Sequence, residues 1–209
     1  MSSVIIDPCC FTRQGLREYL LSHRIDSQCY NGIDTPKHFS DILGQQTPSF
    51  VFISGHCVDN FCPENREMED VIARHPETLF FIFLTLPNGH FNGYLYLREN
   101  IIVTSKALER ENLDRLLSPH LNSVKNNQRR LRKQAIKPVA LSRAETDMLR
   151  MWMSGCDTLQ ISDRMQIKVK TISSHKGNIK KKINTRNKLV IHQLMKISET
   201  LTGGLNTSC

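Results

Sequence analysis

The chain has 209 residues, of which 39% are hydrophobic and 7% aromatic, and its formal net charge at pH 7 is +8. This composition is ordinary for a folded protein, and no apolar run approaches the roughly 18 residues that a membrane span needs. The length suits two small domains. The first residues carry no basic segment and reach Asp7 after a short apolar run, so we expect a cytoplasmic protein without a secretory signal.

The charge is divided unevenly along the chain. Residues 1–124 hold 10 Lys and Arg against 15 Asp and Glu, whereas residues 125–209 hold 18 against 5. The first part is therefore mildly acidic, at −5, and the second is strongly basic, at +13. This division indicates that the second part meets a polyanion such as nucleic acid, with a solvated basic surface as the alternative.

Residues 1–118 alternate between short apolar runs and amphipathic segments. The apolar runs lie at 4–6, 28–30, 50–53, 79–86 and 101–103, and helical patterns lie at 11–21, 36–43, 66–74 and 109–117, with a further short segment near 91–97. Thr35 and Pro36 are typical of an N-cap and a first helical residue. Apolar runs without alternation are typical of strands buried on both faces. The sequence therefore predicts an α/β domain with a doubly wound parallel sheet of five strands in the flavodoxin-like order.

Residues 119–138 show no apolar periodicity and are rich in Lys and Arg, so we interpret them as a basic linker, either a solvated tether or one that touches phosphates. An all-α domain of four helices is expected over 139–202. Ser142 and Glu145 have the spacing of a capping box, and Asp157 or Thr158 is placed to cap a short helix over 159–165. Helices over 170–183 and 187–199 follow. The middle two helices have the order of a helix-turn-helix.

The stretch 170–183 has the features of a recognition helix. Ile172, Lys176, Ile179 and Ile183 fall on one side, which is mainly apolar, and the opposite side is basic with short polar side chains. The second helix of a helix-turn-helix enters the major groove, where lysine, serine and asparagine contact base edges. The candidates for base contact are Ser173, Ser174, Lys176, Gly177 and Asn178. The candidates for phosphate contact are Lys168, Lys170, Thr171, Lys180 and Lys181.

These motifs carry a resemblance. The segments 141–145, 161–165 and 170–175, together with the terminal helix, resemble the LuxR (GerE) type DNA-binding domain. In that family the last helix commonly pairs with its symmetry mate on DNA. The resemblance therefore implies a dimer role for Val190, Leu194 and Ile197, while packing of this helix on its own domain remains the alternative.

LuxR-type domains often follow a receiver domain, and the first domain resembles one that has lost its phosphorylation site. Asp7 matches one of the two acidic metal-binding positions, but Pro8 stands at the second. Gly55 follows the third strand at the position of the phosphorylated Asp, whereas Thr85 and Lys106 match the remaining receiver positions. Phosphoryl transfer needs a carboxylate nucleophile beside a metal. The resemblance thus implies a pseudo-receiver.

Over almost its whole length the chain also resembles a family of bacterial regulators of capsule synthesis. The segments that carry this likeness are 12–16, 18–22, 75–80, 150–153 and 173–180. The resemblance implies an auxiliary activator of exopolysaccharide capsule genes that binds double-stranded promoter DNA as a heterodimer with the response regulator RcsB. It also implies degradation by the Lon protease.

Two readings of other classes compete with this one. The first is a homodimeric LuxR-type regulator that senses a small effector at the carboxyl ends of its strands. The second is an enzyme, which is disfavoured because the sequence has no Gly-rich phosphate loop and no metal-ligand spacing. A metal site built from His56, Cys57 and Cys62 matches no zinc pattern, so we expect neither a metal nor a cofactor.

Overall fold

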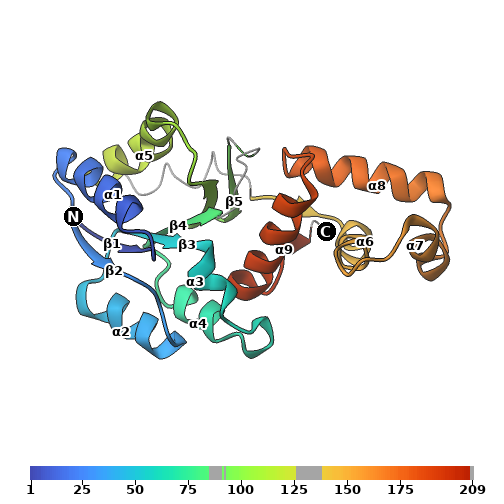
Figure 1. Ribbon diagram of the computed structural model, residues 1–209, viewed down its shortest axis with the longest axis horizontal. Helices are drawn as coiled ribbons and strands as arrows, with labels where there is room; N and C mark the ends of the chain where they lie inside the picture. Colours follow the sequence, from blue (N-terminus) through green and yellow to red (C-terminus); the bar gives the residue numbers. More distant parts are fainter. Residues whose placement is uncertain (85–90, 92, 126–137, 208–209) are drawn as a thin grey trace.

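The computed structural model describes residues 1–84, 91, 93–125 and 138–207. Figure 1 shows an α/β domain at the N-terminal side and a group of helices that extends to the other end of the molecule, with the last long helix between them. Within the described residues no helix is both long and apolar enough to cross a bilayer. The predicted fold, an α/β domain followed by a helical one, is confirmed.

The first domain is built on one sheet. Its strands are β1 (Ser2–Ile6), β2 (Asp26–Tyr30), β3 (Phe50–Ser54), β4 (Leu79–Leu84), β5 (Tyr94–Arg98) and β6 (Ile101–Ser105), and their order is β2-β1-β3-β4-β6-β5. Every neighbouring pair is parallel except β5 and β6. The five parallel strands thus have the predicted flavodoxin-like order. The segment near 91–97 adds a sixth strand, which is antiparallel and lies at the edge.

Helices cover both faces of the sheet. On one face α1 (Cys10–Ser22) and α5 (Arg110–Lys125) bury Leu20 and Leu117 against Phe52 and Phe81, whose rings stack at 4.8 Å. On the other face lie α2 (Pro36–Gln46), α3 (Gly55–Asp59), the 3-10 turn η1 (Pro63–Asn65) and α4 (Glu67–Ala73). Thr35 caps α2 as predicted, because its hydroxyl accepts a hydrogen bond from the His38 amide.

Helix α5 is longer than predicted. It was expected to end near Leu117, with a linker starting at 119, but it passes through Pro119 and ends at Lys125. A proline inside a helix removes one backbone hydrogen bond. The apolar face nevertheless continues past it, since His120 and Leu121 are buried against the first domain, and this burial offsets the lost bond. The rest of the expected linker, 126–137, lies outside the described residues.

The second domain has the four predicted helices. They are α6 (Arg143–Met153), α7 (Thr158–Met165), α8 (Val169–Lys182) and α9 (Lys188–Thr202). The expected capping box of Ser142 with Glu145 is present on α6, and of the two cap candidates for α7 it is Asp157 that caps, in a capping box with Gln160 that was not predicted. A short parallel pair, β7 (Ala140–Leu141) and β8 (Asn206–Thr207), was not predicted.

Helix α9 lies between the two domains (Figure 1). It packs on α3, η1 and α4 and approaches β4 and β5 of the first domain. The three residues for which a dimer role was predicted are Val190, Leu194 and Ile197, and their exposures are 1%, 1% and 0%. In this conformation their side chains are covered by the chain's own residues. Their dimer role stays a prediction, and it requires α9 to leave this position.

Candidate nucleic-acid interface

The inner side of α8 fixes the helix on its domain. Ile172, Ile179 and Ile183 are 0–1% exposed and pack in one core with Met148 and Ile161. Full burial of an Ile side chain contributes about 1.5–3 kcal/mol. The tight turn from α7 is made by Gln166, whose φ of 55° places it in the left-handed region. The opposite side of α8 is therefore held in one orientation.

An ion pair between the buried Glu145 carboxylate and the exposed Lys182 adds a second tie between α6 and α8. The ammonium of Lys182 donates to Glu145 Oε2 at 2.7 Å, and the Ser142 amide donates to the same oxygen at 2.8 Å. Burial by itself would raise the pKa of the Glu145 carboxyl, but these hydrogen bonds outweigh it and hold the pKa below its ordinary value. Glu145 is thus a charged residue inside the domain, and the ammonium of Lys182 serves to hold α8 on α6.

The outer side of α8 is exposed, as a surface for DNA requires. Ser173 and Ser174 donate to backbone carbonyls of the preceding turn at 3.2 and 3.1 Å, so their oxygens remain at the surface. A Cβ added to Gly177 would meet nothing within 4 Å. The backbone at Gly177 therefore has open space beside it. The predicted contact residues that are exposed on α8 or just before it are Lys168, Lys170, Thr171, Ser173, Ser174, Asn178 and Lys181.

Lys176 does not belong to this exposed row. Its ammonium donates to Thr158 Oγ1 at 2.9 Å and lies 5.2 Å from the centre of the Trp152 ring. Lys180 and Lys188 lie over the same ring at 5.6 and 5.9 Å. We name these four residues the Trp152 cluster. Burial, followed by the charges of Lys188 and Lys180, lowers the pKa of Lys176.

The Trp152 cluster gathers three cations from α8 and the start of α9 at one indole on α6. Each cation gains from the ring face, but the three repel one another. A phosphate oxygen placed among them would relieve that repulsion. Lys176 therefore lies away from the exposed row for which base contact was predicted, and the phosphate role of Lys180 stays a prediction.

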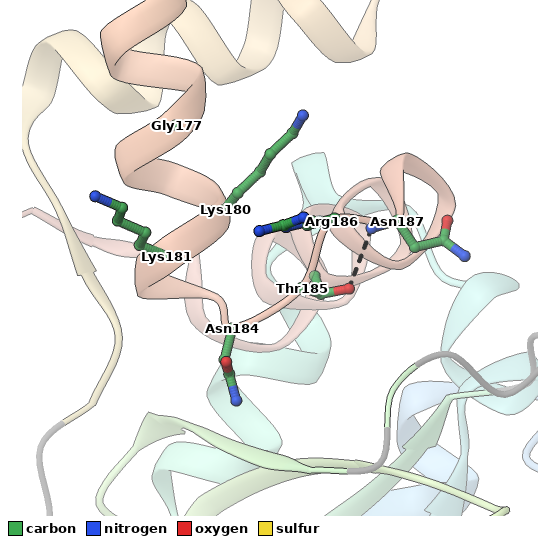
Figure 2. A pocket seen from close by; sticks show the side chains of 7 residues that line it. All are labelled: Gly177, Lys180, Lys181, Asn184, Thr185, Arg186 and Asn187. Atoms are coloured by element: carbon green, nitrogen blue, oxygen red, sulfur yellow. Dashed lines mark hydrogen bonds between the residues drawn. The ribbon is translucent and has the colours of Figure 1, made fainter.

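A pocket of about 810 Å³ lies at the other flank of α8, at its junction with α9. Figure 2 shows the side chains that line it: Gly177, Lys180, Lys181, Asn184, Thr185, Arg186 and Asn187. The Arg186 guanidinium points toward the side of Lys180 and Lys181. The Asn187 amide donates to Thr185 Oγ1 at 3.2 Å, which fixes the entry to α9. Arg186 was not among the predicted contact residues, although its place between the Lys run and the Asn187 cap was a usable signal.

Two of the four residues predicted to form a degenerate receiver site, Asp7 and Lys106, lie in contact. Lys106 Nζ lies 2.6 Å from Asp7 Oδ2, and the Asp7 side chain is 2% exposed. Gly55 is the first residue of α3. Thr85 lies outside the described residues. The Asp7 carboxylate is thus neutralised by Lys106 within the chain.

The metal alternative gains no support from the described residues. Among them no group of three or more His, Cys, Asp or Glu side chains could hold a metal ion. Cys57 is buried, and burial followed by the charge of Asp7 raises the pKa of its thiol. A thiol must lose its proton to bind a metal, so Cys57 is a poor ligand.

An α/β domain of receiver topology joined to a helix-turn-helix with a basic outer face defines a class, the two-domain DNA-binding transcription regulators. Residues 139–195 match the family described as bacterial regulatory proteins, luxR family. Residues 2–129 match the family described as transcriptional regulator RcsA, N-terminal dimerisation domain. The chain belongs to the RcsA family of transcriptional regulators.

Curated relatives agree with this assignment over their whole length. The chain is 42% identical over 206 residues to the transcriptional regulatory protein RcsA of Pantoea stewartii subsp. stewartii, covering 98% of each chain. It is 40% identical over 205 residues to RcsA of Salmonella typhimurium, again covering 98% of each. RcsA of Klebsiella aerogenes is 38% identical over 212 residues, covering 100% of this chain and 99% of the relative.

Solved structures share the fold at low identity. An RcsB–DNA complex matches with a TM-score of 0.53 at 16% identity, covering 94% of this chain and 98% of that one. RcsB of Salmonella enterica serovar Typhimurium bound to the rprA promoter matches with a TM-score of 0.54 at 16% identity, covering 95% and 98%. These likenesses show that the chain has the fold of a two-domain response regulator.

Proposed function

We propose that this regulator is a sequence-specific auxiliary activator of exopolysaccharide capsule genes and that it binds promoter DNA as a heterodimer with the response regulator RcsB. The observation that carries the DNA-binding part is the outer side of α8, which is exposed, basic and rigidly held by a buried inner side. The capsule target and degradation by Lon rest on the resemblance found in the sequence.

The first domain supports the proposed heterodimer with RcsB. Its family is described as a dimerisation domain, and the solved RcsB structures include two RcsB dimers bound to DNA. Gly55 offers no carboxylate at the acceptor position, and Lys106 neutralises Asp7. A regulator of this kind would take its phosphorylation signal through a partner that keeps the acceptor.

The first experiment is a footprint of the full chain on a capsule promoter, with and without RcsB. We expect weak protection by the chain alone and strong, specific protection when both proteins are present. Strong specific protection by the chain alone would contradict the obligate partner. Protection by RcsB that the chain neither extends nor strengthens would contradict the auxiliary role.

The second experiment separates base contacts from phosphate contacts. Lys181→Ala should weaken binding similarly on all sequences and reduce the dependence of log K on log salt by about 0.9, the slope of one phosphate contact. Ser174→Ala should leave the salt slope unchanged and alter the preferred base pairs. Measured affinities on a set of operator variants at several salt concentrations check both. A changed base preference in Lys181→Ala would refute its phosphate role.

The effector-sensing homodimer is the alternative function. Doubly wound sheets bind ligands at the carboxyl ends of their strands. The pocket of about 460 Å³ between the domains lies instead where β6 begins, lined by Ile72, Pro76, Asn100 and Leu201 among others. This pocket therefore does not favour the effector-sensing function. A rise in melting temperature with a cytoplasmic metabolite would support it.

A further inference from the structure

The connection from β4 to β6 differs from that of an ordinary doubly wound sheet. Two parallel neighbours normally need a crossover, usually a helix, that packs on the sheet. Here the described part of the connection contains strand β5 and no helix, while 85–90 and 92 lie outside it. The apolar side chains on the α4 side of these strands belong to the same core as α9. They are Phe80, Ile82, Leu84, Leu97, Ile101 and Val103.

Helix α9 covers this region with its apolar side. Val190, Leu194, Ile197 and Leu201 recur at helical spacing and are 0–1% exposed. The helix packs on α3 and α4 and reaches β4 and β5. We name this surface of the first domain, formed by β4, β5, α3 and α4, the α9 docking face.

Polar contacts fix α9 on the docking face at its middle and at its C-terminal end. Lys196 Nζ lies 3.4 Å from Asp59 Oδ1 and donates to the Asp59 carbonyl oxygen at 3.3 Å. The Arg98 guanidinium donates to the carbonyl oxygen of Thr202 at 2.6 Å. The contact thus has a defined register along the helix.

Gly55 makes the close approach possible. A Cβ at this residue would lie 3.0 Å from the Phe83 carbonyl oxygen, 3.1 Å from Gln193 Nε2 and 3.6 Å from Ile197 Cδ1. Distances of 3.0–3.4 Å are tighter than nine in ten real Cβ contacts, so a side chain at this position requires its neighbours on β4 and α9 to give way by a few tenths of an ångström. Glycine therefore suits this position for a reason unrelated to phosphorylation.

We propose that α9 completes the α/β domain in the place of the crossover helix, and that Gly55 is the contact residue that lets it dock. The apolar side of α9 becomes available to a second DNA-binding domain only after it leaves this face. That last consequence rests on the dimer role in the proposed function; the docking itself does not.

The test compares Gly55→Ala with Gly44→Ala in the full chain without DNA. Gly44 is an exposed helix residue whose added Cβ would meet nothing within 4 Å, so it controls for the change in residue type. In Gly55→Ala we expect about tenfold faster hydrogen exchange in α9 and β5 and a larger radius of gyration by X-ray scattering. Wild-type values for both in a folded Gly55→Ala would overturn the proposal.

A charge exchange tests docking without touching the core of the first domain. Lys196→Asp and Asp59→Lys should each speed exchange in α9, and the double variant should recover part of the lost protection, because the ion pair is re-formed with reversed signs while the bond to the carbonyl oxygen of residue 59 is lost. Wild-type protection in both single variants would overturn the proposal. Because these measurements contain no DNA, a failure of the proposed DNA binding would leave them unchanged.

Discussion

Gly177 is the residue at which helix stability and the predicted DNA contact oppose each other. Glycine in a helix interior costs roughly 1 kcal/mol relative to alanine, and nothing in the free chain requires it, because an added Cβ would have open space. A glycine here makes physical sense when another molecule approaches the backbone. Its role is then visible only in the complex.

Replacing Gly177 with Ala should therefore raise the free energy of unfolding by about 0.5–1 kcal/mol and weaken DNA binding. Urea unfolding and a binding titration measure the two effects. Gly15→Ala is the matched control, since it lies in α1 with the same open space and should stabilise without changing DNA binding. A more stable Gly177→Ala that binds DNA undiminished would show that no close approach occurs there.

Glu145 gives the second domain a stability that depends on pH. Because the pKa of its carboxyl is below the ordinary value in the folded state, the contribution is present above that ordinary value and is lost as the pH falls through the folded pKa. Glu145→Gln should cost about 1–2 kcal/mol at pH 7, and the difference from wild type should shrink under acid conditions. Urea unfolding at several pH values, with exposed Asp163→Asn as control, checks this. A difference independent of pH would contradict the charged pair.

At the scale of elements, the apolar and capping patterns predicted most of the fold. Continuous apolar runs indicated the buried parallel strands, and Thr35, Ser142 and Asp157 marked helix starts that the structure confirms. The predictions failed at elements whose extent or pairing is determined by packing against residues distant in the sequence. Helix α5 continues past Pro119 because its apolar face stays covered, and β5 is an edge strand whose hairpin partner, β6, fixes it.

The same limit applies to the candidate site. Helical periodicity identified the outer side of α8 and placed Lys176 on the side of the buried isoleucines, but it could not reveal the contacts of Lys176 with Thr158 and Trp152 on neighbouring helices. Nor could it place Arg186 beside the Lys180 and Lys181 pocket. These arrangements depend on how α6, α7 and α9 meet α8, and single-helix patterns carry no such information.

For the Trp152 cluster we predict that removing one cation leaves the free chain as stable or more stable but lowers its affinity for DNA. Lys188→Ala removes one of three mutually repelling cations, so the free chain should be unchanged or more stable by a few tenths of a kcal/mol. DNA affinity should fall about three- to tenfold at 0.1 M salt, with unchanged base preference. Thermal unfolding and binding titrations measure both. A loss of stability with intact binding would mean that Lys188 serves only the fold.

At the scale of the whole molecule, the two domains share α9. The helix follows the DNA-binding helices in sequence, yet its apolar side packs on the first domain, and the dimer pairing predicted for that side competes with this packing. If the proposed dimer role holds, two steps separate the free chain from a paired complex on DNA: α9 leaves the docking face, and a partner covers its apolar side. A partner that binds through the first domain could favour both steps at once.

The most direct test of the proposed function is the mass of the protein–DNA complex on a capsule promoter, measured with and without RcsB. The account predicts one copy of this chain and one of RcsB on each operator, and loss of this chain from the complex when Lys181 is replaced by Ala at moderate salt. A complex that contains two copies of this chain and no RcsB, or RcsB alone when both are supplied, would contradict it.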